Sequence, residues 1–449
     1  MNMRSEQTKY EKLSDALDSG ELQQVGYTLN KSMRPTEVAH LLEKSPPKER
    51  QLLWNLIDSD LEGEVLQHLG DDLQASILSK LDPSQVLAMT EGLDTDDVVD
   101  ILQQLPNTVM RELLETMDEQ NRERIETALA YPEDTAGGLM NMDTITIRPD
   151  ISVETAMRYI RRHSEIPEMT DSLMVVSRKG AYIGLLPLTK LLTSDPSHMV
   201  REVMKTDIAP IDAETPATEV VQLFENEDLV SAPVVDENRR LLGRITIDDV
   251  VDVIREESDH SIMSMAGLDE DVDTFAPMMQ TARRRAVWLG INLITAFVAS
   301  AVIGLFEATL EQVVALAVLM PIVASMGGIA GSQTLTLVIR GQALGHLERA
   351  NTGWLLNREL LVGLINGIVW AAVIAAIAIL WFDDVTIGVV IALAIVINLV
   401  AGAMAGTLLP VGLKAMGIDP ALAGGVLLTT ITDVVGFFAF LGLATLFFA

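Results

Sequence analysis

Residues 420–449, PALAGGVLLTTITDVVGFFAFLGLATLFFA, decide how this chain is interpreted. The stretch is long enough to cross a bilayer as a helix, which takes roughly 20 apolar residues. It carries one formal charge, the carboxylate of Asp433. Placing a carboxylate at membrane depth costs several kcal/mol, so such a group usually marks an ion or proton path. Because Thr429, Thr430 and Thr432 stand beside it, the segment predicts a polar path through a membrane.

Four further apolar stretches precede this one. Together they predict five spans, at residues 286–306, 313–339, 360–382, 385–413 and 420–449, and Asp433 is the only charge within them. A soluble core does not use five stretches of this length, so we expect a transmembrane domain over residues 281–449 in a lipid bilayer.

The basic residues of this half all fall on one side of the predicted membrane. Arg283–Arg285 precede the first span, Arg340, Arg349 and Arg358 separate the second from the third, and Lys414 separates the fourth from the fifth. In the loops on the opposite side, all charged side chains are acidic. The positive-inside rule therefore predicts a cell inner-membrane protein with cytoplasmic N-terminal domains and its C-terminus outside.

The charge of the chain is concentrated in its first part. The chain holds 32 basic and 63 acidic side chains, a net of −31. Residues 281–449 hold 7 basic and 8 acidic side chains, a net of −1, which leaves −30 for residues 1–280. Such an acidic surface repels phosphate backbones, so no nucleic-acid partner is expected. Because the chain has no cysteine, no Walker-type phosphate loop and no histidines at metal spacing, an enzyme is not expected.

The fifth span presents a small, polar helical face. Its members are Gly425, Thr429, Thr432, Asp433 and Gly436. The spacing predicts a pore-lining face; the alternative is a buried helix contact containing a protonated Asp433. Oxygen ligands alone suit a hard cation, Mg2+ ahead of Ca2+ or Mn2+.

The second span contains the sequence MPIVASMGGIAGSQT, residues 320–334. Pro321 removes one backbone hydrogen bond, and Gly327, Gly328 and Gly331 are expected to loosen the helix further. Such irregular backbone is predicted to offer carbonyl oxygens to a cation or its water. Two other glycine pairs at spacing four indicate close helix packing: Gly363/Gly367 and Gly402/Gly406.

These motifs resemble the MgtE family of magnesium channels. The resemblance rests on Pro321…Gly327-Gly328…Gly331…Gln333 and on Asp419-Pro420-Ala421…Thr429-Thr430…Asp433…Gly436. It implies a homodimer whose pore lies at the dimer axis, lined by the second and fifth spans, with Asp433 holding a largely hydrated Mg2+. Many relatives have Asn where this chain has Ile329, so we expect a difference in selectivity or conductance.

Residues 137–253 contain an internal repeat. The segment Val175-Val176…Gly184 maps onto Val234-Val235…Gly243 with a constant offset, and each copy predicts strand, helix, strand, strand, helix. The pattern resembles a pair of cystathionine-β-synthase (CBS) domains, at 137–200 and 201–253. In such modules a Gly…Thr-x-x-Asp segment often binds adenine nucleotides. Gly243, Thr246 and Asp249 match it in the second copy only, so ATP is a candidate ligand and a purely structural repeat is the alternative.

Residues 1–136 and 248–280 complete the predicted architecture. Short amphipathic helices over 1–136 must stack to be stable, and they resemble the MgtE N-terminal superhelical domain. The segment 248–280 resembles the family's connecting, or plug, helix. The expected fold class is a multidomain membrane protein: an α-helical N-terminal domain, α/β tandem CBS domains, the plug helix and five transmembrane helices. The resemblance places Mg2+-binding carboxylates at Glu64, Asp96, Asp100, Asp248, Asp249, Asp252, Glu256, Glu257, Asp259 and Asp419.

The mechanism that follows is a Mg2+ channel with its own Mg2+ sensor. The acidic domains are expected to repel each other at low Mg2+, by about 1–4 kcal/mol per close charge pair, and to close around bridging ions at high Mg2+. Two alternatives stay open at this point. One is an ion-coupled secondary transporter of Mg2+ or Co2+, and the other is a CBS-regulated membrane sensor without ion flux.

Overall fold

The computed structural model describes residues 21–90, 92–163, 166–167, 169–268, 273–347 and 350–448. Residues 1–20, parts of the segment 248–280, Arg349 and Ala449 lie outside this description. The chain divides into two compact units. The N-terminal unit is Met1–Ser258 with Asp271–Ala276, and the membrane unit is Asp259–Glu270 with Pro277–Ala449.

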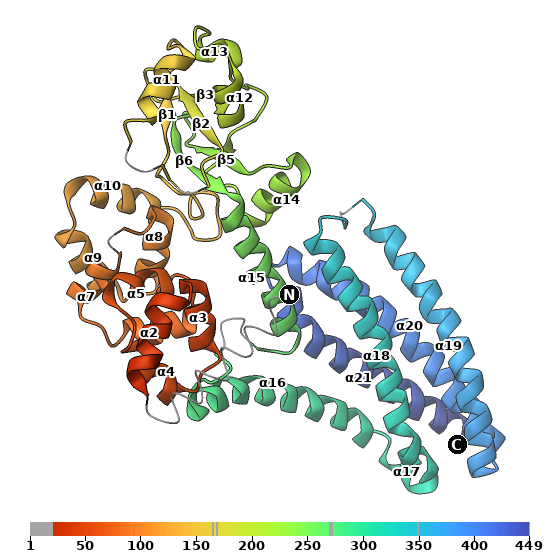
Figure 1. Cartoon of the computed structure of the whole chain (residues 1–449). Coiled ribbons are helices and arrows are strands. Elements are labelled where there is room, and N and C mark those ends of the chain that lie inside the picture. Colours follow the sequence, from red (N-terminus) through yellow and green to blue (C-terminus); the bar gives the residue numbers. More distant parts are fainter. Residues whose placement is uncertain are drawn as a thin grey trace. The chain divides into compact units, whose positions relative to one another are not determined.

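The N-terminal unit begins with short helices stacked around one core (Figure 1). Leucines at helical spacing, such as Leu42, Leu66 and Leu102, are fully buried where neighbouring helices meet. None of these helices exceeds 11 residues, so each depends on its neighbours for stability. The helices are α2 (Leu22–Ser32), α3 (Pro35–Glu43), α4 (Pro47–Trp54), α5 (Ser59–Leu66), α6 (Asp71–Leu78), α7 (Pro83–Thr90), α8 (Thr95–Gln103), α9 (Asn107–Thr116) and α10 (Glu119–Ala128).

The repeat folds as two equivalent α/β halves, which confirms the predicted element order. Each half has a three-stranded sheet with one parallel and one antiparallel pairing. Val175 pairs with Gly184 and Val234 pairs with Gly243, and each β-bulge follows directly, so the repeat extends to the register. The elements are β1 (Thr146–Ile147), α11 (Val153–Ile160), β2 (Ser172–Val176), β3 (Tyr182–Pro187), α12 (Leu188–Thr193), α13 (Val200–Val203), β4 (Ile211–Asp212), α14 (Ala217–Glu227), β5 (Ser231–Val235) and β6 (Leu241–Thr246).

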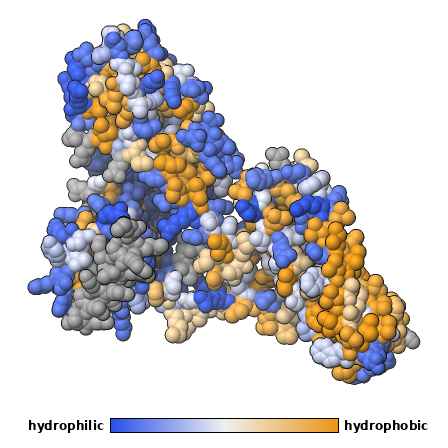
Figure 2. Space-filling view, turned by 45° about the vertical axis from the view of Figure 1, so that its right-hand side comes forward, coloured by the Kyte–Doolittle hydropathy of each residue, from blue (hydrophilic) through white to orange (hydrophobic). Residues whose placement is uncertain are grey.

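The membrane unit contains five helices that are long and apolar enough to span a bilayer. They are α16 (Met278–Gly304), α18 (Ala315–Ala343), α19 (Thr352–Phe382), α20 (Val385–Ala415) and α21 (Pro420–Phe448); the short α17 (Glu307–Gln312) joins the first two. α20 is the most buried of the five and packs against α18, α19 and α21. Apolar side chains form a broad band on the surface of this unit (Figure 2). Helix α15 (Ile247–Met265) begins in the N-terminal unit and ends in the membrane unit.

Glycines set the close approach of α20 to its neighbours. A Cβ atom on Gly402 would lie 2.8 Å from the Gly327 carbonyl oxygen, and one on Gly406 would lie 2.6 Å from that of Gly331. Gly363 and Gly367 of α19 pack in the same way against α20. The packing role predicted for the pairs 363/367 and 402/406 is confirmed.

Candidate functional site

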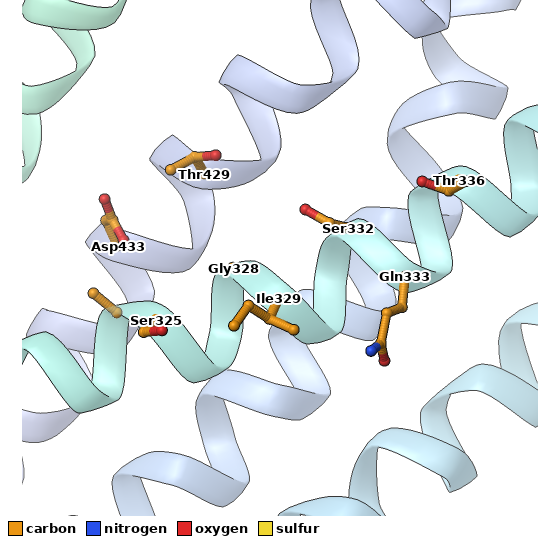
Figure 3. A pocket seen from close by; sticks show the side chains of 9 residues that line it. Ser325, Gly328, Ile329, Ser332, Gln333, Thr336, Thr429 and Asp433 are labelled. Carbon is orange, nitrogen blue, oxygen red and sulfur yellow. The ribbon is translucent and has the colours of Figure 1, made fainter. Parts of the chain in front are cut away.

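An open groove of about 700 Å3 runs between α18 and α21 of the membrane unit (Figure 3). Thr429 and Asp433 extend from the same edge of α21, one helical turn apart. Apart from the amide nitrogen of Gln333, every polar side-chain atom in the groove is oxygen, and Asp433 carries its one charge. The residues that line the groove are Ala324, Ser325, Gly328, Ile329, Ser332, Gln333, Thr336, Thr429 and Asp433.

The Asp433 carboxylate is half-buried in this groove. Among the residues that the structure describes, no positive side chain lines the groove beside it. A carboxylate at membrane depth without a positive partner is energetically costly. A cation, held directly or through its hydration water, would supply the missing counter-charge.

Thr429 contributes an oxygen acceptor to the groove. Its Oγ1 donates a hydrogen bond of 2.8 Å to the Gly425 carbonyl oxygen of its own helix. The hydroxyl proton is therefore engaged, and the oxygen lone pairs are left to accept from water. Gly425 lies one turn earlier on an open side of α21, where a Cβ atom would meet nothing within 4 Å.

The structure corrects the predicted polar face at Thr432 and Gly436. Thr432 is fully buried and donates to the carbonyl oxygens of Leu428 and Thr429, both at 3.0 Å. A Cβ atom on Gly436 would lie 2.6 Å from Nδ2 of Asn398. Neighbouring helical positions diverge by about 100°, so Thr432 cannot share the direction of Asp433. The predicted polar face therefore divides in two: Thr429 and Asp433 line the groove, whereas Thr432 and Gly436 pack against other residues.

The predicted irregular backbone in α18 is also wrong. Residues 315–343 are helical throughout, with Pro321 inside the helix. A proline removes one intrahelical hydrogen bond, and the surrounding turns retain theirs. Gly327 and Gly331 are buried against α20 and α21 rather than loosening the helix, so only Gly328 of the three glycines reaches the groove.

The sequence did not predict three hydroxyl-bearing residues of the groove, which are Ser325, Ser332 and Thr336. With Ile329 they follow a spacing of four, three and four residues, which is a helical stripe that could have identified them. In the view of Figure 3, Ser332 extends on the side of Thr429, whereas Ile329 and Gln333 extend on the opposite side of α18.

A second candidate site is an acidic cluster between α8 and α15 in the N-terminal unit. Desolvation, reinforced by the carboxylates of Asp249 and Asp97, raises the pKa of Asp96 to about 9. Desolvation and the carboxylate of Asp94 raise the pKa of Asp97 to about 7. Asp100 is exposed to solvent on one side. Its pKa is raised by desolvation and by the charge of Glu133. Sequence interpretation predicted Asp96 and Asp100 here and missed Asp97.

Hydrogen bonds to the segment 141–143 fix the position of α8. Asp94 accepts from Asn141 Nδ2 at 2.9 Å, and Thr95 Oγ1 donates to Asp143 at 2.7 Å. Arg124 pairs with the same Asp143 carboxylate. These contacts hold the start of α8 against the CBS pair, and the acidic turn that follows is thereby brought close to Asp249.

The predicted nucleotide residues cap α15. The Thr246 amide and hydroxyl both donate to Asp249, at 3.0 and 2.9 Å, and the hydroxyl also contacts Asp248. This is a helix N-cap arrangement that satisfies otherwise orphaned donors. A Cβ atom on Gly243 would lie 2.6 Å from the Asn141 carbonyl oxygen, so this glycine permits a close backbone contact. Desolvation raises the pKa of Asp249 to about 6, against the lowering effect of the Thr246 hydrogen bond.

The remaining predicted carboxylates lie along α5 and α15. Burial lowers the pKa of His68, and the charges of Asp252 on α15 and Glu64 on α5 oppose that effect, so these groups share one region. Glu256 and Glu257 follow on α15. Within the described ranges, no three acidic or histidine side chains come close enough to hold one ion.

The end of α15 contacts the start of α21 inside the membrane unit. His260 directly follows the predicted site residue Asp259. Its Nε2 atom lies 3.2 Å from Asp419 Oδ2. Asp419 also accepts from the backbone N–H groups of Ala421 and Leu422, at 2.9 and 3.2 Å, and so caps α21. This contact confirms the predicted approach of the plug helix to the loop that contains Asp419.

Comparison with known proteins identifies the family. Residues 320–443 match the model of the MgtE divalent cation transporters, 33–134 the MgtE intracellular N domain, and 136–196 and 200–256 the CBS domain. The chain is 30% identical over 439 residues to the magnesium transporter MgtE of Thermus thermophilus, covering 97% of each chain. It is 29% identical to that of Bacillus subtilis, covering 92% of each. The chain belongs to the MgtE family of magnesium transporters.

A solved structure supports the same assignment for the N-terminal unit. The cytosolic domain of a Mg2+ channel MgtE, crystallised in complex with ATP, is 31% identical, has a TM-score of 0.50 and covers 54% of this chain and 99% of its own. Together with the five apolar helices, the family makes this chain a multi-pass membrane protein with an intracellular N domain.

This MgtE chain has a second carboxylate within its long apolar helices, which corrects the expectation that Asp433 is alone. α19 begins at Thr352, so it includes Arg358 and Glu359. Glu359 is buried and accepts from Thr334 Oγ1 at 3.2 Å and from Arg358 Nη1 at 2.9 Å. The adjacent Arg358 and Glu359 interrupt the apolar sequence, which is why the span was predicted to start at residue 360.

Proposed function

We propose that this chain is a Mg2+ channel in which the groove between α18 and α21 forms one wall of the pore. The observation that carries the proposal is the half-buried Asp433 carboxylate, which shares this groove with hydroxyl oxygens and the Gln333 amide. Hydroxyl and carboxylate oxygens are the ligands that hard cations prefer, and no nitrogen or sulfur ligand of a softer metal lines the groove.

The donor set suits a hydrated ion better than a dehydrated one. Mg2+ gives up water reluctantly and is usually held through one or two carboxylates together with retained water. One carboxylate per groove cannot replace a hydration shell. The hydroxyls of Thr429, Ser325 and Ser332 are placed to accept hydrogen bonds from the water that stays on the ion.

A homodimer would complete the pore. The groove is open along one side, and a second copy facing it would enclose the ion path and bring a second Asp433. The exposed apolar face of α16, with Leu289, Leu293 and Phe297, is suited to lipid or to the same partner. We place the C-terminus outside the cell inner membrane, on the strength of the positive-inside argument.

The acidic cluster is proposed as the Mg2+ sensor. Crowded carboxylates with raised pKa values favour any species that neutralises them, and a bound divalent cation, which competes with protons, can neutralise two carboxylates at once. Binding to the compact arrangement would shift the population toward it and draw α15 toward its closed position. The sensing groups are Asp96, Asp97, Asp100, Asp248, Asp249, Asp252 and Glu64, with Glu256, Glu257, Asp259 and Asp419 along the plug contact.

ATP is a second candidate regulator. The support is the solved relative of the N-terminal unit, which was crystallised with ATP. In this chain Thr246 and Asp249 are already hydrogen-bonded to each other, so nucleotide binding would compete with the cap of α15. Calorimetric titration of the full chain with ATP, alone and with Mg2+, tests this role.

Uptake by proteoliposomes tests the channel. The intact chain is expected to take up Mg2+ at a set membrane potential without any opposing ion gradient, and Asp433→Ala is expected to lose that uptake. Uptake that requires an opposing H+ or Na+ gradient would indicate the coupled transporter instead. Nucleotide binding without ion flux would indicate the membrane sensor.

A further inference from the structure

Asn398 occupies the junction of three membrane helices. It lies in α20 and is fully buried, with an exposed fraction of 0%. Its Nδ2 donates a hydrogen bond of 2.8 Å to the Val323 carbonyl oxygen of α18. This bond links a side chain of α20 to the backbone of α18.

Two glycines make room for the Asn398 amide. A Cβ atom on Gly327 of α18 would lie 2.2 Å from Nδ2, and one on Gly436 of α21 would lie 2.6 Å from it. No real side chain tolerates such distances, so the amide fixes how near α18 and α21 come to each other. Gly327 directly precedes Gly328 of the groove, and Gly436 follows Asp433 by three residues.

The amide carries a cost that an apolar side chain would avoid. Within the described residues, the Asn398 Oδ1 atom is buried without a hydrogen-bond partner. Buried polar atoms are normally satisfied, and each unsatisfied one carries the full desolvation penalty of its group. An unsatisfied oxygen in a fully buried site is a cost that stability alone does not explain.

We propose that Asn398 is a positioning residue that sets the spacing of α18 and α21 and thereby the selectivity of the groove among divalent cations. The inference rests on the proposed channel function. Asp433 lies on α21, whereas the hydroxyls of Ser325, Ser332 and Thr336 lie on α18, so their separation depends on the contact behind them. A hydrated Mg2+ is recognised by oxygens at fixed separation, and a looser pair of helices admits ions with other hydration geometry.

Selective uptake by the full chain tests the inference. Proteoliposomes at a set potential receive Mg2+ or Ca2+, and the ratio of the two uptake rates is compared among variants. Asn398→Leu, which keeps the branched outline but not the hydrogen bond, is expected to lower the Mg2+ to Ca2+ ratio about fivefold, the size of effect that one net hydrogen bond provides. The matched control is Thr407→Val, because Thr407 is equally buried in α20 but bonds only to the Ala403 carbonyl oxygen of its own helix. The control is expected to keep the wild-type ratio.

The outcomes separate this inference from the channel itself. An intact chain that takes up no Mg2+ refutes the channel. A working channel in which Asn398→Leu keeps the wild-type ratio, or in which Thr407→Val lowers it equally, overturns the role of Asn398. If the leucine variant does not fold, Asn398→Ala combined with Gly436→Ala decides the question, because the new methyl group fills the vacated space without restoring the bond to Val323. A wild-type ratio in that double variant also overturns the proposal.

Discussion

Arg50 is buried and forms a bidentate ion pair with the half-buried Asp273, which lies 223 positions later in the chain. Nη1 lies 2.6 Å from Oδ2 and Nη2 lies 3.1 Å from Oδ1, while Nε donates to the Leu42 carbonyl oxygen at 3.0 Å. Asp273 belongs to the segment that leads directly into α16. The segment that precedes the first membrane helix is therefore anchored to the core of the N-terminal helices.

Removing one partner of this pair should loosen the segment before α16. Arg50→Ala leaves the half-buried Asp273 carboxylate without its guanidinium partner, which costs about 1–3 kcal/mol. Hydrogen–deuterium exchange of the full chain should show lost protection in α4 and in residues 273–276. The matched control is Arg122→Ala, which breaks the exposed Arg122–Glu126 pair and should change protection very little. Unchanged protection in the Arg50 variant would contradict the proposed tie.

The same pair predicts a pH dependence. Desolvation works to raise the pKa of Asp273, but hydrogen bonds from Arg50 and from the Phe275 amide outweigh it and hold the pKa below 3.8. A lowered carboxyl pKa stabilises the folded state above the ordinary pKa, and that contribution is lost as the pH falls through the lower value. Exchange protection of residues 273–276 should thus be constant at neutral pH and fall only in strong acid.

The acidic cluster should respond to pH in the opposite sense. The raised pKa values of Asp96, about 9, and Asp97, about 7, mean that the compact arrangement binds protons that separated carboxylates release. Without divalent cations, compactness should be greatest near pH 5 and decline as the pH rises toward 9. Because the chain contains no cysteine, spin labels can be placed at two introduced cysteines, Glu112→Cys and Arg178→Cys, for distance measurements.

Millimolar Mg2+ should flatten that pH dependence, since the cation replaces the protons. Replacing Asp96 and Asp97 together by Asn should also flatten it without Mg2+. A label distance that rises with pH equally in the Asn variant would show that other groups control the compaction.

Thr429 and Thr432 should differ in their effect on transport. Thr429→Val removes an oxygen from the groove and is expected to reduce Mg2+ uptake several-fold. Thr432→Val replaces a buried hydroxyl that bonds only to its own helix and should leave uptake close to wild type. Side-by-side proteoliposome uptake measures both, and equal losses in the two variants would contradict the assignment of Thr429 alone to the ion path.

Gly406 should not tolerate even one methyl group. Gly406→Ala places a Cβ atom 2.6 Å from the Gly331 carbonyl oxygen, and overpacking of this kind costs about 1–3 kcal/mol. The melting temperature of the detergent-solubilised chain should fall. Gly412→Ala on the same helix meets no atom within 4 Å and is the matched control, with little change expected. Equal melting temperatures for the two variants would show that α18 and α20 can separate freely.

The sequence by itself determined the elements and their order. The apolar lengths predict five spans because a bilayer imposes a minimum length, and the constant offset between Val175-Val176 and Val234-Val235 predicts two equal α/β halves. Asp433 was identifiable because a carboxylate is expensive in an apolar stretch. The span lengths, the repeat and the charge of Asp433 are local features of the sequence, so they can be recognised without knowledge of the packing.

Only the tertiary structure decided which side of each helix faces the groove. The distinction between Thr429 and Thr432 depends on where α20 lies, and the packing role of Gly327 depends on Asn398, which is distant in sequence. The contact of Arg50 with Asp273, and that of Thr334 with Glu359, likewise join separate segments. A sequence pattern gives the period of a helix but not its rotation against its neighbours, because that rotation is set by complementary volumes on several helices at once.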